Sequence, residues 1–298
     1  MLSIIIPVYN NAQTLTQLTK RLNETLTSIP FEVIFINDGS TDNSAEILRH
    51  LAQKHSFVSA IFLSRNFGQH PATFAGFERA RGDQIIVMDA DLDDEPEKIP
   101  LILEKLKGDV DIVYTIRKDL KPRFSSKLFH LCFSKLTATD VPVGIGVFRG
   151  FSRKVLDSML RYKEFNIQYS SLMAYMGFKH DFLTIQGKIR QRAQSAYSFN
   201  KRMNMALTTL ILYTAFPFRM SLYTGIFMVI LSSGYGMLRL IQNVFFERNL
   251  PEVFFLIFLF NCLMFGFIFV TLGIIGLYMF VHLKESLKRP RYLIDEII

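Results

Sequence analysis

Residues 84–91 read QIIVMDAD, an apolar run that stops at an acidic pair, Asp89 and Asp91. A short run of this kind, rich in β-branched side chains, is typical of a strand buried on both faces. Further runs alternate with helical patterns along the first part of the chain, at residues 2–7, 31–36, 58–63 and 111–115. Strands that alternate with helices predict an α/β fold with a doubly wound, mostly parallel sheet.

Polar side chains follow three of these runs at the point where each one ends. They are Tyr9 after the first run, Asp38 after the second, and Asp89 with Asp91 after the fourth. Ligands of open α/β sheets bind beyond the carboxyl ends of the strands, so we expect these residues to share one edge of the sheet. The sequence therefore places the candidate site at that edge.

Asp89 and Asp91 have the chemistry of a metal site. Two carboxylates can hold Mg²⁺ or Mn²⁺ while phosphate oxygens complete the shell, and the metal would neutralise charge on a leaving nucleoside diphosphate. The alternative is a solvated acidic loop, because Asp93 and Asp94 continue the charge. Asp38 is suited to hydrogen-bond a ribose or a base edge, although its surroundings also form a good turn. The edge shared with Asp38 favours the metal site.

The composition changes along the chain, although the average is 50% hydrophobic with a net charge of +8. Residues 1–200 read as a catalytic domain. Residues 201–220 carry an apolar helical face beside basic side chains, which predicts an amphipathic helix at a membrane interface, with an ordinary surface helix as the alternative. No basic tract interleaved with aromatic residues indicates nucleic acid.

Residues 221–298 predict a membrane region of two helices with a basic tail. The apolar runs at residues 221–241 and 253–283 are long enough to cross a bilayer. Basic residues flank this pair on the outside, whereas the loop between the runs has few. The positive-inside rule then places the catalytic domain and the C-terminus in the cytosol.

Several motifs together resemble glycosyltransferase family 2, in its polyprenyl-phosphate group of dolichol-phosphate mannose synthase-like and bactoprenol glucosyltransferase-like proteins. They read IPVYN at residues 6–10, NDGSTD at 37–42, RNFG at 65–68, ARGD at 80–83 and MDADL at 88–92. GIIGLY at residues 273–278 and KRPRY at 288–292 match the two-span membrane tail of that group. The resemblance covers nearly the whole chain and implies a GT-A-like fold.

The resemblance also implies roles for particular residues. Those expected to bind the nucleotide-sugar are Pro7, Tyr9, Asn11, Asp38, Asp89 and Ala90. Those expected at the catalytic centre are Asp91, Asp93 and Arg117, with the metal on Asp89 and Asp91. Contacts to donor diphosphate or acceptor phosphate are expected from Arg190, Arg192, Ser195, Tyr197 and Lys201. For the basic residues among these, attraction to an anionic membrane surface is the alternative.

Three positions depart from the family pattern. Asn11 stands where the family is usually acidic, and Asp93 stands where it has Gln. Val147 replaces the carboxylate of the family's Gly-Asp-Phe-Arg, a candidate base. A sugar hydroxyl needs a base to attack, whereas a phosphate monoester, with a second pKa of about 6, is already anionic. The loss of this candidate base is therefore tolerated best with a polyprenyl-phosphate acceptor. Alternatively, Asp93 or Asp140 has taken over the role of the base.

The activity that the resemblance implies is inverting, metal-dependent transfer of a sugar from a UDP- or GDP-sugar to a polyprenyl phosphate. The enzyme would work on the cytosolic face of a bacterial inner membrane, for a cell-envelope polysaccharide or lipopolysaccharide. One alternative acceptor is a hydroxyl of a lipid-linked oligosaccharide. A non-catalytic membrane partner with the same fold is a third reading. A second copy of the chain and a flippase are further candidate partners.

Overall fold

The computed structural model describes residues 1–117, 145–162, 169–185, 251–287 and 290–298, with isolated positions between 223 and 241. The chain divides into two compact units. The first comprises Met1–Ser134, Ala138–Gln191 and Lys288–Ile298, and the second comprises Lys135–Thr137 and Arg192–Leu287. The last residues of the chain thus belong to the same unit as the first.

The first unit is built on an 8-stranded sheet in the order β7-β5-β6-β4-β1-β2-β3-β8. Its strands are β1 (Leu2–Val8), β2 (Phe31–Asn37), β3 (Val58–Leu63), β4 (Gln84–Val87), β5 (Ile112–Arg117), β6 (Ile145–Ser152), β7 (His180–Ile185) and β8 (Ile294–Ile297). The central pairs β4–β1, β1–β2 and β2–β3 are parallel, as is β5–β7. The β4–β6, β5–β6 and β3–β8 pairs are antiparallel. The predicted α/β fold with a mostly parallel core sheet is confirmed.

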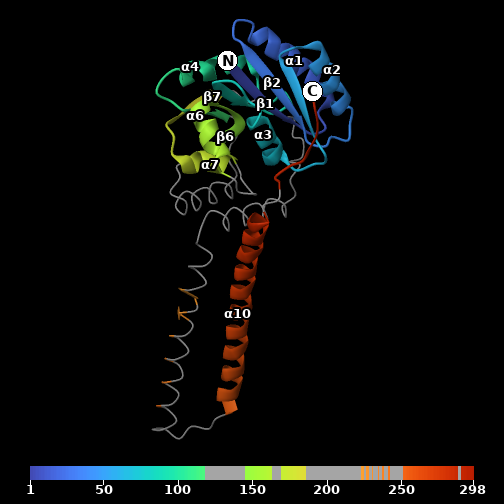
Figure 1. Cartoon of the computed structure of the whole chain (residues 1–298). Coiled ribbons are helices and arrows are strands. Elements are labelled where there is room, and N and C mark those ends of the chain that lie inside the picture. Colours follow the sequence, from blue (N-terminus) through green and yellow to red (C-terminus); the bar gives the residue numbers. More distant parts are fainter. Residues whose placement is uncertain are drawn as a thin grey trace. The chain divides into compact units, whose positions relative to one another are not determined.

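Helices cover both faces of the sheet in the first unit (Figure 1). One face packs against α1 (Ala12–Thr25), α2 (Ser44–Lys54) and α4 (Ile99–Leu106). The other packs against α3 (Gln69–Phe77), α6 (Arg153–Leu160) and α7 (Tyr169–Met176). Successive strand residues point to opposite faces, and β1 follows this rule, with Ile4 and Ile6 on the first face and Ile5 on the second. Because helices cover both faces of the sheet, the sequence of β1 is apolar and does not alternate between apolar and polar residues.

The amino edge of the central strands is held by a buried carboxylate. Glu32 of β2 is 6% exposed and accepts hydrogen bonds from Ser3 Oγ at 2.7 Å and from the amide of Arg81 at 2.7 Å. The Arg81 guanidinium adds bonds at 2.9 and 2.7 Å. Because this edge lies opposite the carboxyl ends of these strands, the ARGD stretch at residues 80–83 has a structural role.

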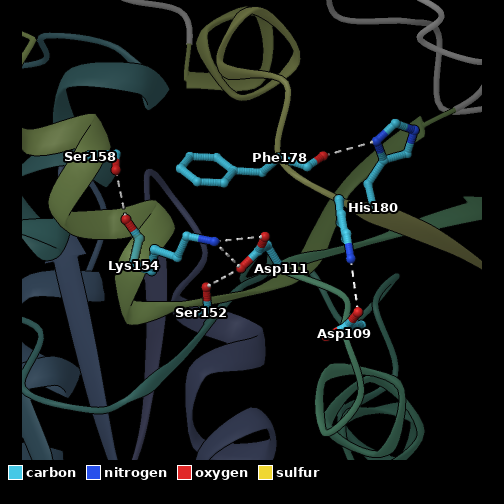
Figure 2. A network of polar contacts seen from close by, with 8 residues as sticks. Asp109, Asp111, Ser152, Lys154, Ser158, Phe178 and His180 are labelled. Atoms are coloured by element: carbon cyan, nitrogen blue, oxygen red, sulfur yellow. Dashed lines mark hydrogen bonds and ion pairs between the residues drawn. The ribbon is translucent and has the colours of Figure 1, made fainter.

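Figure 2 shows a polar network that joins β5, β6 and the turn before β7. Lys154 of α6 contacts Asp111 at 3.2 Å and lies 5.1 Å from the centre of the Phe178 ring. Ser152 Oγ reaches the same carboxylate at 3.5 Å, and Lys179 pairs with Asp109 at 2.8 Å. These residues precede β5 and β7 or end the antiparallel β6, so the network lies away from the carboxyl edge.

The second unit contains α10 (Pro251–Ser286), a helix of 36 residues. Over the part of the chain that the structure describes, no helix meets the length and apolarity that a membrane crossing requires. The two predicted spans are therefore not confirmed and stay a prediction. The interfacial helix predicted at residues 201–220 and most of the span predicted at 221–241 lie outside the described residues.

Candidate active site

The carboxyl edge of the sheet brings together the polar residues that the sequence singled out. Tyr9, Asp38 and Asp89 follow the ends of β1, β2 and β4, which are parallel neighbours. Their backbones are tied as well, because the Asp38 amide donates to Val8 O at 2.9 Å. Pro7 lies within β1 in register with Ile36. The predicted gathering at one edge is therefore what the structure shows.

Asp38 organises the loop that follows β3. Its carboxylate is 3% exposed and accepts the amides of Phe67 at 2.7 Å and Gly68 at 2.9 Å. Burial raises the pKa of Asp38, and these two hydrogen bonds oppose the rise. We call residues 64–68 the donor loop. A contact with ribose or base stays a prediction, whereas the anchoring of the donor loop is seen directly.

Gly39 brings the donor loop against the end of β2. Its φ of +64° is a conformation that favours glycine. A Cβ placed on Gly39 would lie 2.6 Å from both Arg65 C and Asn66 N, so the two backbones touch. The guanidinium of Arg65 in turn lies 4.5 Å from the centre of the Phe67 ring. The loop is thus fixed by backbone contact as well as by Asp38.

The turn after β1 is locked to the start of α2. Asn10 has a φ of +57°, and its Oδ1 accepts the amide of Thr41 at 2.8 Å. The amide of Asn11 donates to Ser44 Oγ at 3.0 Å. Asn11 Oδ1 accepts the amide of Tyr9 at 3.4 Å, so this residue supports the turn that carries the exposed Tyr9 ring. That role does not need the acidic side chain expected from the family.

The acidic loop is folded around Asp94, which in the sequence is one member of a run of acidic residues. Asp94 is 1% exposed and accepts the amide of Asp89 at 3.1 Å. Asp91 accepts the amide of Asp93 at 3.1 Å, and Leu92 between them has a φ of +62°. Gln69 Nε2 donates to Asp89 Oδ1 at 2.7 Å. The loop is therefore an ordered turn that presents Asp89 toward the start of α3.

The donor set suits a metal that is shared with a ligand. Within the described residues, no group of three or more His, Cys, Asp or Glu side chains could hold a metal ion. A hard cation that takes one or two protein carboxylates and completes its shell with phosphate oxygens and water does not need such a group. Asp89 and Asp91 fit that requirement. Ala90 contributes its carbonyl, which accepts Thr14 Oγ1 at 2.6 Å and fixes the loop on α1.

A buried cation lies below the edge and was not anticipated. Arg149 of β6 is 2% exposed, with its guanidinium 5.4 Å from the Tyr114 ring centre and 5.2 Å from that of Tyr169. Burial raises the pKa of Tyr169 to about 12. Burial, and then the charge of Arg149, lower the pKa of His70 to about 4. His70 Nδ1 is buried without a hydrogen-bond partner among the described residues. The sequence signal for this buried cation is a single Arg within the otherwise apolar strand β6.

Val147 lies in β6, two residues before Arg149, which pairs with Val87 at the end of β4. Its side chain packs against the apolar cluster beneath α3 and α7. The position where the family pattern has a carboxylate is therefore part of an apolar cluster here.

The remaining predicted residues are placed only in part. Arg117 ends β5, whose carboxyl end shares the edge with β4, but its side chain lies outside the description. The five residues of the basic stretch also lie outside the described residues: Arg190, Arg192, Ser195, Tyr197 and Lys201. Their expected phosphate contacts stay predictions.

A family model described as Glycosyl transferase family 2 matches residues 3–160, which contain every part of this edge described above. The chain belongs to that family. A bactoprenol glucosyl transferase of Shigella phage SfX is 30% identical over 98% of this chain and 98% of the relative. An undecaprenyl-phosphate 4-deoxy-4-formamido-L-arabinose transferase of Klebsiella pneumoniae is 29% identical over 99% of this chain and 93% of the relative.

One solved structure supports the fold of this family 2 member. Glucosyl-3-phosphoglycerate synthase from Mycobacterium tuberculosis, in complex with UDP, aligns with a TM-score of 0.50 at 16% identity. The alignment covers 71% of this chain and 78% of that one. The family match confirms that the chain is a glycosyltransferase and that polyprenyl-phosphate glycosyltransferases are among its relatives.

Proposed function

We propose that this glycosyltransferase moves a sugar from a UDP- or GDP-sugar to a polyprenyl phosphate at the cytosolic face of a bacterial inner membrane. The observation that carries the proposal is the gathering of Asp38, Asp89 and Gln69 at the carboxyl edge, around one ordered loop. Full-length similarity to transferases whose names specify bactoprenol or undecaprenyl phosphate supports the acceptor.

In this proposal the donor lies across the ends of β1, β2 and β4. The exposed Tyr9 ring, 48% accessible, offers an aromatic face beside Asp38. Asp89 and Asp91 would hold Mg²⁺ or Mn²⁺ against the donor diphosphate. When bound, that metal neutralises charge that develops on the departing nucleoside diphosphate. Inversion follows if the acceptor oxygen attacks the anomeric carbon on the face opposite the nucleotide.

The apolar Val147 favours an acceptor that is already ionised. A polyprenyl phosphate, with its second pKa of about 6, presents an anionic oxygen at neutral pH and needs no base. A sugar hydroxyl of a lipid-linked oligosaccharide would need one, and Val147 stands in β6 where the family pattern has a carboxylate. Asp93, in the same turn as Asp91, is the candidate base for such an alternative.

A membrane location is part of the proposal. It rests on the apolar runs at residues 221–241 and 253–283 of the sequence, each long enough for a hydrocarbon core of ~30 Å, and on relatives whose names specify bactoprenol or undecaprenyl phosphate. Several large apolar side chains of α10 are exposed, among them Phe265, Leu272 and Met279.

The decisive experiment offers labelled UDP- and GDP-sugars to the purified full chain with either polyprenyl phosphate or a lipid-linked oligosaccharide. We expect label on the phosphate only, in the presence of Mg²⁺ or Mn²⁺. Asp91→Asn should abolish transfer, whereas Asp109→Asn should not, because Asp109 forms only a surface ion pair with Lys179. Label appearing on the oligosaccharide alone would refute the proposed acceptor, and unchanged transfer by Asp91→Asn would refute the metal site.

A further inference from the structure

The last residues of the chain complete the catalytic sheet. β8 runs antiparallel to β3, with Phe62 in register with Glu296, on the edge that β3 would otherwise leave open (Figure 1). Ala60 and Ile298 exchange backbone hydrogen bonds of 2.8 and 2.9 Å. An unpaired apolar edge strand is a liability for a folded protein, and β8 covers β3 and replaces it as the edge with a short, charged strand of four residues. We call residues 290–298 the tail.

The tail also contacts the donor loop directly. The amide of Ser64, the first residue of the loop, donates to Leu293 O at 3.0 Å. This bond is made just before the β8 strand begins, where the β3–β8 ladder shifts its register. The residue that leads into the Asp38-binding amides is therefore held by the tail.

Side chains of the tail hold the helix at the other end of the loop. The Arg291 guanidinium lies 4.7 Å from the ring centre of Phe74 in α3 and donates to Tyr162 O. The Tyr292 hydroxyl hydrogen-bonds Glu78, just after α3, and burial with that contact raises the pKa of Tyr292. The helix α3 begins at Gln69, the residue that contacts Asp89. Both ends of the donor loop are thus attached to one short segment.

We propose that the tail is a positioning element of the donor site, which holds residues 64–68 so that the amides of Phe67 and Gly68 meet Asp38. A loop that is already ordered has less conformational entropy to lose when the ligand binds, so affinity depends on its anchors. The tail touches no reacting atom in this scheme. The inference rests on the proposed binding of the donor beside Asp38.

The test compares the full chain with a variant that ends at Pro290. We expect donor affinity to fall about tenfold, equivalent to ~1.4 kcal/mol, with a matching rise in the KM for donor and little change in the KM for acceptor. Amide hydrogen exchange should accelerate at residues 64–69 but not at residues 31–37 of β2. A synthetic peptide of residues 291–298 should restore both. Glu296→Gln, which weakens only an exposed ion pair with Arg49 at 2.7 Å, is the matched control and should behave as the parent.

Equal donor affinity in the full and shortened chains would overturn the proposal. If the shortened chain loses exchange protection throughout, the full-length double variant Arg291→Met, Tyr292→Phe decides, because it keeps side-chain volume and β8. Faster exchange at residues 64–69 with weaker donor binding supports the positioning role, and parental values of both refute it. If the parent binds no UDP- or GDP-sugar, the proposed function fails, while the exchange measurement still tests the tail.

Discussion

Replacing Gly39 by Ala tests whether the donor loop depends on close backbone contact. The φ of +64° imposes a left-handed strain on Ala of ~1–2 kcal/mol. The new Cβ would also meet Arg65 C and Asn66 N at 2.6 Å, and overpacking of this kind costs a further ~1–3 kcal/mol. We therefore expect Gly39→Ala to destabilise the protein by ~2–5 kcal/mol and to move the loop away from Asp38, so that donor affinity falls about tenfold.

Gly177→Ala is the matched control for this prediction. Gly177 has a φ of +66°, but a Cβ there would meet no atom within 4 Å, and it follows α7 away from the site. Gly177→Ala should destabilise the protein only by the backbone strain of ~1–2 kcal/mol. Each kcal/mol should lower the melting temperature by about 2–4 °C. Thermal unfolding and isothermal titration with the donor measure both quantities. Equal melting temperatures and equal donor affinities in the two variants would show that the loop contact is unimportant.

Three further predictions concern side chains around the site and the opposite edge. The pKa of His70 is about 4 in the folded protein and 6.5 for an unperturbed histidine. The free energy of unfolding of the wild type should therefore fall by about 3 kcal/mol as pH falls from 6.5 to 4. In denaturant titrations across that range, His70→Gln should lose less stability. Burial raises the pKa of Glu32, but the hydrogen bonds from Ser3 and Arg81 outweigh burial, so the net pKa is lowered. The ionised Glu32 therefore stabilises the fold above pH 4.5, and this stabilisation fades at lower pH. Glu32→Gln should therefore cost ~1–3 kcal/mol at pH 7, less in acid, with donor affinity unchanged. Val147→Asp should not raise kcat with polyprenyl phosphate at pH 7.5, and a severalfold gain would contradict the base-free mechanism.

Sequence reasoning predicts the first five strands, β1 to β5, because burial on both faces leaves an apolar run, as at Ile4, Ile5 and Ile6. It predicts neither β6 nor β7. It found the shared edge because parallel neighbours end together. It could not find β8, whose Ile-Asp-Glu-Ile sequence is mostly exposed and is recognisable as a strand only beside β3. Pairing between residues this distant in the chain leaves no local pattern.

The candidate site was predictable in its residue types and less so in the roles of those residues. The contact of Asp38 with a nucleotide stays a prediction, and what the structure shows is that Asp38 binds backbone amides. Asp94 looked like solvated charge, yet it is the buried centre of its turn. Gln69 and Arg149 come from other elements and reach the site only through the tertiary fold. A motif specifies which functional groups are present, but it does not specify which of its residues binds backbone amides.

The position of β8 has a consequence for how the protein is made. Arg49 and Glu296 are separated by 247 residues, so their contact cannot form during synthesis until residue 296 has emerged from the ribosome. Until then β3, Val-Ser-Ala-Ile-Phe-Leu, lacks its β8 partner and exposes unpaired backbone groups to other chains. The pairing of β3 with β8 is therefore a late step of folding.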